Sequence, residues 1–135
     1  MEPNLTKVAV ALVKNNDGEV LIVKNRQKEV GKDEAQLIWQ FPGGKIKQEE
    51  TPEETVKRET LDQTGYQIIP KDIIDERKHP EFSVYIYYVA SDIEGQEPQE
   101  RKETTTDIAK WVRVQELENY FNSSIEDKVK EYLNG

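Results

Sequence analysis

Residues 44–66, which read GKIKQEETPEETVKRETLDQTGY, most strongly limit what this chain can fold into. Thr51 precedes Pro52 and lies three residues before Glu54, which is the pattern of a helix N-cap, a first-turn proline and a capping-box acid. Gly65 can readily adopt the left-handed conformation that ends a helix. These signals predict a helix that begins at Pro52 and ends immediately before Gly65.

Several polar and charged residues of the expected helix are spaced so that they fall on one face. Glu59, Asp62 and Gln63 stand at i, i+3 and i+4, so their side chains are expected on one face. Arg58 follows Glu54 by four residues and can pair with it while it also lies beside Glu59. An acidic helix is usually a solvated face held by such ion pairs. That interpretation explains the charges, but not the paired glycines, the cap and the terminal glycine in one register.

The segment resembles the Nudix box, whose pattern is Gly, five residues, Glu, seven residues, Arg-Glu, an apolar residue, any residue, Glu-Glu, any residue, Gly and an apolar residue. The identical positions are Gly44, Glu50, Arg58, Glu59 and Gly65. Tyr66 suits the closing apolar position, and the preceding LIWQFPGGKI resembles the approach to the box in MutT-type nucleoside triphosphate pyrophosphohydrolases. Three positions depart from the pattern, because Thr60 replaces an apolar residue and Asp62 and Gln63 replace the two glutamates.

The resemblance implies a metal-dependent hydrolase that cleaves the diphosphate linkage of a nucleoside diphosphate derivative. The expected kind is a MutT-type pyrophosphohydrolase that acts on a nucleoside triphosphate. Mg²⁺, or Mn²⁺ in its place, would bridge phosphate oxygens and lower the pKa of the attacking water. Glu59 would be a metal ligand or the base, and Arg58 would orient it. Glu50 would belong to the outer part of the metal site, and the carbonyl of Gly43 would complete the coordination. The expected substrate-binding residues are Gly44 and Lys45.

The departures from the pattern predict a weakened or altered metal site in an intact fold. Asp62 keeps its charge but is one methylene shorter than glutamate, and Gln63 offers a neutral amide that binds Mg²⁺ far less strongly than a carboxylate. An enzyme should compensate with a carboxylate elsewhere, such as Glu50, Glu59 or Glu103, the last from the acidic loop 91–106. The alternative function is a non-catalytic nucleotide-binding or regulatory module, which needs no such replacement. For Glu103 the competing interpretation is a solvated acidic loop.

Composition narrows the class of protein further. The 135 residues are about the length of one domain, so we expect residues 1–135 to form a single domain. The absence of cysteine excludes disulfides and zinc–thiolate sites and favours a cytoplasmic protein. The net charge of −8 argues against DNA or RNA as a partner, although a bound cation would still admit a small nucleotide. No signal peptide or 18-residue apolar run appears, so no membrane association is expected. Monomer and homodimer both remain open.

The rest of the chain predicts an α/β fold with a mixed sheet and helices on both sides, which the resemblance makes a Nudix-fold α/β/α sandwich. The expected strands are 7–14, 19–23, 67–69, 73–77, 82–90 and 111–114. A short helix over 116–121 and a terminal helix through about 133 follow. Trp39 and Phe41, beside the glycine turn, either pack in the core or stack on a purine. His79 is expected at the surface or in a loop contact.

Overall fold

The computed structural model describes residues 6–25, 38–78, 83–95, 106–121, 125 and 127–134. The strands within these ranges are β1 (Thr6–Val13), β2 (Glu19–Asn25), β3 (Ile38–Gln40), β4 (Gly43–Lys45), β5 (Gln67–Lys78), β6 (Val84–Glu94) and β7 (Thr106–Arg113). The helices are α1 (Pro52–Thr64), the 3₁₀ turn η1 (Val114–Glu116), α2 (Leu117–Tyr120) and α3 (Asp127–Asn134). No helix in the described ranges is both long enough and apolar enough to cross a membrane.

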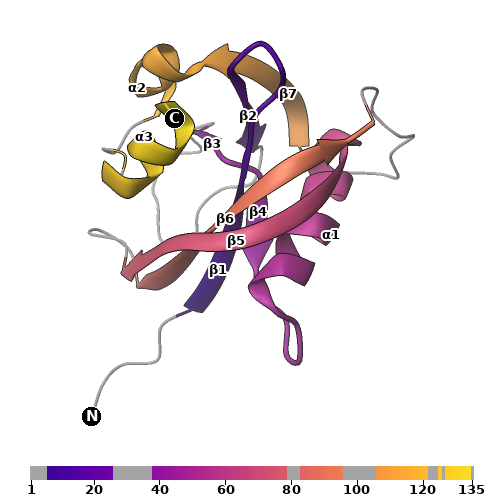
Figure 1. Cartoon of the computed structure of the whole chain (residues 1–135). Helices are drawn as coiled ribbons and strands as arrows, with labels where there is room; N and C mark the ends of the chain where they lie inside the picture. The colour runs from indigo at the N-terminus through magenta and orange to yellow at the C-terminus, as the bar shows by residue number, and fades with distance from the viewer. Residues whose placement is uncertain are drawn as a thin grey trace.

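The strands form two sheets. A mixed sheet has the order β4-β1-β6-β5, in which β1 runs parallel to β6 and the other pairs are antiparallel (Figure 1). A second, antiparallel sheet has the order β3-β2-β7. The strand expected over 19–23 is therefore confirmed, but it pairs with β7 and not along β1. The turn over residues 15–18 passes the chain from one sheet to the other.

Helices cover both faces of this arrangement because β1 is apolar on both of its sides. Leu12 packs in one core, which also contains residues of α2 and α3 such as Leu117 and Val129. Ala11 and Val13 pack in a second core with Val56 of α1. All of these side chains are almost completely buried. The near-continuous apolar run of β1 thus reflects burial on two faces, and the predicted α/β/α sandwich is confirmed.

Several strands are longer than the sequence pattern indicated. Residues 67–78 form the single strand β5 where two short strands were expected, because two register shifts, at Pro70/Asp72 and Ile73/Asp75, let pairing with β6 continue past the proline. Strand β6 extends to Glu94 and β7 begins at Thr106, so residues 91–94 and 106 of the expected loop belong to strands. Residues 38–40 and 43–45 are short strands where only a turn was expected. His79 and Glu103 lie outside the described residues.

Helix α1 has the ends that the sequence predicts. The Thr51 hydroxyl accepts a hydrogen bond from the Glu54 amide at 3.1 Å, and the Glu54 carboxylate accepts one from the Thr51 amide at 2.9 Å. Gly65 ends the helix in the left-handed conformation, with φ of 83°, and its amide donates to the Leu61 carbonyl. Because Glu54 serves the cap, Arg58 pairs elsewhere, and the expected Glu54–Arg58 ion pair is replaced by contacts described below.

Thr60 of α1 stands where the Nudix-box pattern has an apolar residue, and its cost to stability can be tested. Its side chain is fully buried, and its hydroxyl has no hydrogen-bond partner among the described residues. We expect Thr60→Val, which keeps the shape, to raise the free energy of unfolding by about 1 kcal/mol and the Tm by about 3 °C. Thr55→Val is the matched control, because the equally buried Thr55 hydroxyl donates to Glu50 at 2.8 Å and its loss should destabilise. Calorimetric unfolding in which Thr60→Val lowers the Tm would contradict this account.

Candidate active site

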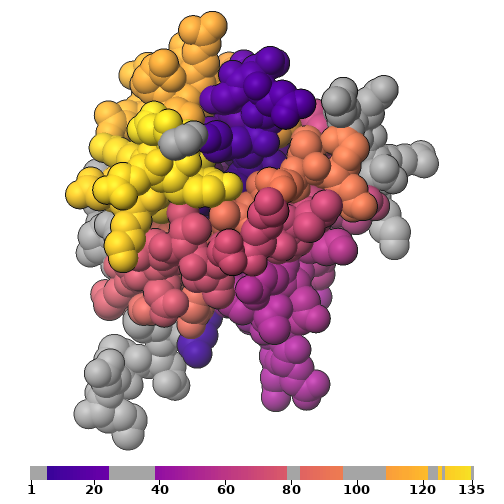
Figure 2. Space-filling view, in the orientation of Figure 1, coloured from indigo at the N-terminus to yellow at the C-terminus, as the bar shows by residue number. Residues whose placement is uncertain are grey.

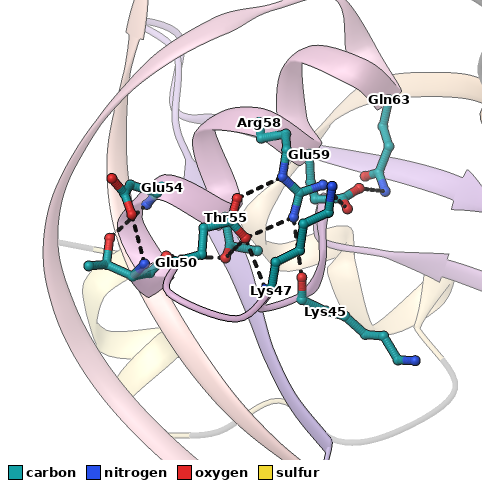
Figure 3. A network of polar contacts seen from close by, with 9 residues as sticks. Lys45, Lys47, Glu50, Glu54, Thr55, Arg58, Glu59 and Gln63 are labelled. Carbon is teal, nitrogen blue, oxygen red and sulfur yellow. Dashed lines mark hydrogen bonds and ion pairs between the residues drawn. The ribbon is translucent and has the colours of Figure 1, made fainter.

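The segment that resembles the Nudix box forms a network of polar contacts where the loop after β4 enters α1 (Figure 3). A tight turn positions Glu50, whose amide donates to the Lys47 carbonyl at 3.0 Å. The Glu50 carboxylate accepts hydrogen bonds from the Lys47 amide at 3.0 Å and the Thr55 hydroxyl at 2.8 Å. The loop projects from the body of the molecule (Figure 2), so Glu50 is held by its own turn and by the first turns of α1.

Arg58 joins the two glutamates that match the box. Its Nε and Nη2 donate to the two Glu50 oxygens at 2.8 and 3.0 Å, and its Nη1 donates to Glu59 Oε2 at 2.7 Å. The planar guanidinium group is suited to such two-sided binding of carboxylates. Arg58 Nη2 also donates to the Lys45 carbonyl at 3.3 Å, which ties the helix to the end of β4. The resemblance gave Arg58 the role of orienting Glu59, and the geometry is suited to that role.

These contacts fix the charge state of the network. The hydrogen bond from Arg58 is the largest cause that lowers the pKa of Glu50 to about 2, with the Lys47 amide and the Thr55 hydroxyl acting in the same direction. The same hydrogen bond raises the pKa of Arg58 above its ordinary value. Glu50 and Arg58 therefore both stay ionised at any pH near neutrality. Two carboxylates around one guanidinium leave the network with a net negative charge.

Gly44 is needed because the Glu59 carboxylate lies against it. A Cβ atom at Gly44 would stand 2.8 Å from both Cδ and Oε2 of Glu59. Any larger residue would therefore push Glu59 away from the turn or force the turn away from α1. The match of Gly44 to the family pattern has a steric explanation, which does not depend on the backbone conformation of this glycine.

Gln63, a departure from the pattern, is buried and has defined partners. Its Oε1 accepts from the Gly43 amide at 3.1 Å, while its Nε2 donates to the Gly43 carbonyl at 2.9 Å and to Glu59 Oε1 at 3.1 Å. Only 7% of Gln63 is exposed. Asp62, one residue earlier, is exposed on α1. Of the three residues expected on one face, the fold thus brings Glu59 and Gln63 into contact and leaves Asp62 in solvent.

The described residues, as they lie, do not fit a divalent metal ion. No group of three or more His, Cys, Asp or Glu side chains in the described ranges is arranged to hold one. Glu50 is occupied by Arg58, Lys47 and Thr55, and the Gly43 carbonyl already accepts from an amide. Mg²⁺ requires several oxygens at about 2.0–2.1 Å in octahedral geometry, and usually carboxylates among them. Glu103, the expected extra ligand, lies outside the described residues.

Lys45 and the aromatic candidates occupy separate surroundings. The exposed Lys45 side chain extends away from the glutamates (Figure 3), so its ammonium group is free of them. Phe41 is buried and packs edge to face on Phe121, with ring centroids 4.9 Å apart, as expected for a core residue. Trp39 is only partly buried and packs in the same manner on Tyr120 at 5.5 Å. The two aromatic residues that flank the glycine turn therefore differ in exposure.

The sequence did not predict that two lysines lie beside Trp39. Lys24 Nζ lies 5.5 Å from the centre of the Trp39 ring, and Lys110 Nζ lies 5.9 Å from it and 4.9 Å from the Tyr120 ring. These are cation–π contacts, and they place two positive charges over partly buried aromatic rings. The lysines come from β2 and β7, and no local spacing in the sequence relates them. Only the strand pairing, which sets Lys24 opposite Trp39, brings them together.

A two-sheet α/β/α sandwich with this glycine, glutamate and arginine network defines the class of Nudix-fold proteins. The chain belongs to the NUDIX domain family, whose model matches residues 4–133. Among solved structures, it is similar to a NUDIX hydrolase from Nitrosomonas europaea, with a TM-score of 0.78 and 14% identity over 98% of this chain and 90% of that one. It is also similar to a MutT protein from Methanosarcina mazei Go1, with a TM-score of 0.67 and 19% identity over 99% and 94%.

Two curated relatives resemble the chain in sequence. An 8-oxo-dGTP diphosphatase of Haemophilus influenzae is 35% identical over 65 residues, which span 48% of this chain and 45% of that protein. A putative 8-oxo-dGTP diphosphatase of Bacillus subtilis is 26% identical over 130 residues, or 96% of this chain and 81% of that protein. The first match therefore spans less than half of the relative's length, and the second spans most of it.

Proposed function

We propose that this chain is a Nudix hydrolase that cleaves the diphosphate linkage of nucleoside diphosphate derivatives, and that it converts a nucleoside triphosphate to the monophosphate and pyrophosphate. The observation that carries the proposal is the Arg58 fork that holds Glu50 and Glu59 beneath the glycine turn. The two curated relatives are named as 8-oxo-dGTP diphosphatases, so an oxidised purine deoxynucleotide is the first substrate to test. Those names favour an enzyme over a non-catalytic nucleotide-binding module.

Different residues would position the catalytic carboxylate, bind the phosphates and bind the base. Arg58 holds the Glu59 carboxylate against the glycine turn, in position to bind a cation or accept a proton from the attacking water. The exposed Lys45 ammonium supplies a positive charge for the phosphates. The partly exposed Trp39, flanked by Lys24 and Lys110, offers a ring and two charges to an anionic ligand with a base.

Hydrolases of the Nudix family generally need a divalent metal, which neutralises phosphate charge when it is bound. We propose Mg²⁺ or Mn²⁺ here; Glu59 would hold the ion together with a carboxylate from outside the described ranges, while the exposed Asp62 lies apart from Glu59. Glu103 is the candidate by position in the sequence. Because Glu50 is committed to Arg58, it would act through the guanidinium group and not through the ion. Such a site should be weaker than one built on two adjacent glutamates.

The test is a product analysis on a panel of nucleotides. The full chain is incubated with 8-oxo-dGTP, the four ordinary dNTPs and ADP-ribose, each with MgCl₂, MnCl₂ or EDTA, and the products are separated by ion-exchange chromatography. We expect a nucleoside monophosphate and pyrophosphate from at least one triphosphate, with product at background in EDTA. Release of orthophosphate, which indicates cleavage at the terminal phosphate, would contradict the proposal. So would an intact panel with both cations.

A further inference from the structure

The side-chain amide of Gln63 joins two oxygens that belong to distant parts of the chain. We propose that Gln63 acts as a neutral bridge in the place of a cation, and that it holds Glu59 against the glycine turn without any metal ion at this point. Gln63 is then a positioning residue of the candidate site and not a damaged metal ligand. The inference concerns the folded protein alone and holds for any substrate.

Three hydrogen bonds define the bridge and orient the Gln63 amide. The two hydrogens of Nε2 point to the Gly43 carbonyl at 2.9 Å and to Glu59 Oε1 at 3.1 Å, and Oε1 accepts from the Gly43 amide at 3.1 Å. The amide cannot be reversed, because its oxygen would then face two acceptors and its nitrogen would face a donor. Both backbone groups of Gly43 are thus paired with one side chain, 20 residues later in the chain.

The Nε2 atom of Gln63 lies between two oxygens, the Gly43 carbonyl oxygen and Glu59 Oε1, and donates a hydrogen bond to each. A carbonyl and a carboxylate converge there, and only a hydrogen-bond donor or a cation can lie between them without cost. The amide fills that position, so Mg²⁺ could share these two oxygens only if the Gln63 side chain left. The remaining charge of Glu59 is met from its other oxygen by Arg58 at 2.7 Å. The position is therefore satisfied without a metal ion.

A glutamate at position 63 would reverse this situation. It has nearly the same shape, and one oxygen could still accept from the Gly43 amide. The other oxygen would face the Gly43 carbonyl and the Glu59 carboxylate with no hydrogen to donate. Two carboxylates and a carbonyl would then converge, and a bound cation would relieve their repulsion. The native protein and Gln63→Glu should therefore differ in how strongly their folding depends on divalent cations.

Thermal unfolding of the full chain with EDTA or with increasing MnCl₂ measures that difference. In EDTA we expect Gln63→Glu to unfold about 5–10 °C below the native protein. Its Tm should then rise with MnCl₂ by more than that of the native protein, in proportion to the logarithm of the concentration. Gln48→Glu, which adds the same charge at an exposed position of the loop, is the matched control and should follow the native protein. Equal MnCl₂ responses in all three proteins, or an unchanged Tm of Gln63→Glu in EDTA, would overturn the proposal.

A second measurement follows the bridge in the native protein. The side-chain amide resonances of Gln63 in ¹H–¹⁵N spectra are assigned by their loss in Gln63→Met. We expect two separated resonances with slow hydrogen exchange, unchanged by millimolar MgCl₂. If MgCl₂ moved them to the position and exchange rate of a free amide, the cation would be displacing the bridge and the proposal would be wrong. Neither measurement uses a nucleotide, so their result is independent of whether the hydrolase assignment holds.

Discussion

Glu59→Gln is expected to lower kcat/KM for nucleotide hydrolysis by at least about 100-fold, because a positioned carboxylate that binds a cation or accepts a proton typically contributes that much. The substitution keeps the size of the side chain and removes its charge. The new amide group cannot accept from both Arg58 Nη1 and Gln63 Nε2, which now donate to the two oxygens of Glu59 at 2.7 and 3.1 Å. We therefore also expect a small fall in Tm, of a few degrees or about 1 kcal/mol.

Steady-state kinetics on the best nucleotide of the panel, with calorimetry on the same preparations, measures both effects. Glu53→Gln is the control, because Glu53 lies in the first turn of the same helix and the substitution removes the same negative charge as Glu59→Gln. It should keep both the rate and the Tm of the native protein. A Glu59→Gln enzyme with the native rate would remove Glu59 from the reaction, and a loss of rate in both variants would point to the charge of the helix as a whole.

Gly43→Ala is expected to cost about 3 kcal/mol or more of folding free energy, and to lower the Tm by roughly 10 °C. A Cβ atom at Gly43 would overlap the Ala9 carbonyl oxygen and stand 2.7 Å from the Cα of Val10. Both contacts are with the backbone of β1, which pairs with β4 at this position, so no side chain can turn aside to make room. The strands would have to separate, and the hydrogen bonds between Gly43 and Gln63 would be strained with them.

Gly18→Ala separates this steric cost from the conformational cost of losing a glycine. Gly18 has φ of 78°, a conformation that favours glycine, but a Cβ atom there would meet nothing within 4 Å. Its replacement should cost about 1 kcal/mol. Denaturant unfolding of the two variants would show the difference directly. Equal losses in the two variants would mean that β1 and β4 can adjust, and the explanation for Gly43 would fail.

The sequence by itself determined the local parts of this protein. The ends of α1 could be predicted because Thr51, Pro52 and Gly65 act on backbone groups within a few residues of themselves. The burial of β1 on two faces followed from an apolar run with no polar side. The family was recognisable for the same reason, since its pattern lies in one short segment where spacing alone sets the register of loop and helix.

The tertiary structure decided which side chains meet. Spacing along the helix favoured Glu54 as the partner of Arg58, whereas the fold supplies Glu50 from the preceding loop because the cap holds Glu54. Gln63 looked like a lost metal ligand until packing placed its amide on both backbone groups of Gly43. Hydrogen bonds between residues far apart in the chain depend on strand pairing and on how the helix sits against the sheet. The distance between the helix and the sheet is set by the packed cores on either side, and no local pattern in the chain encodes it.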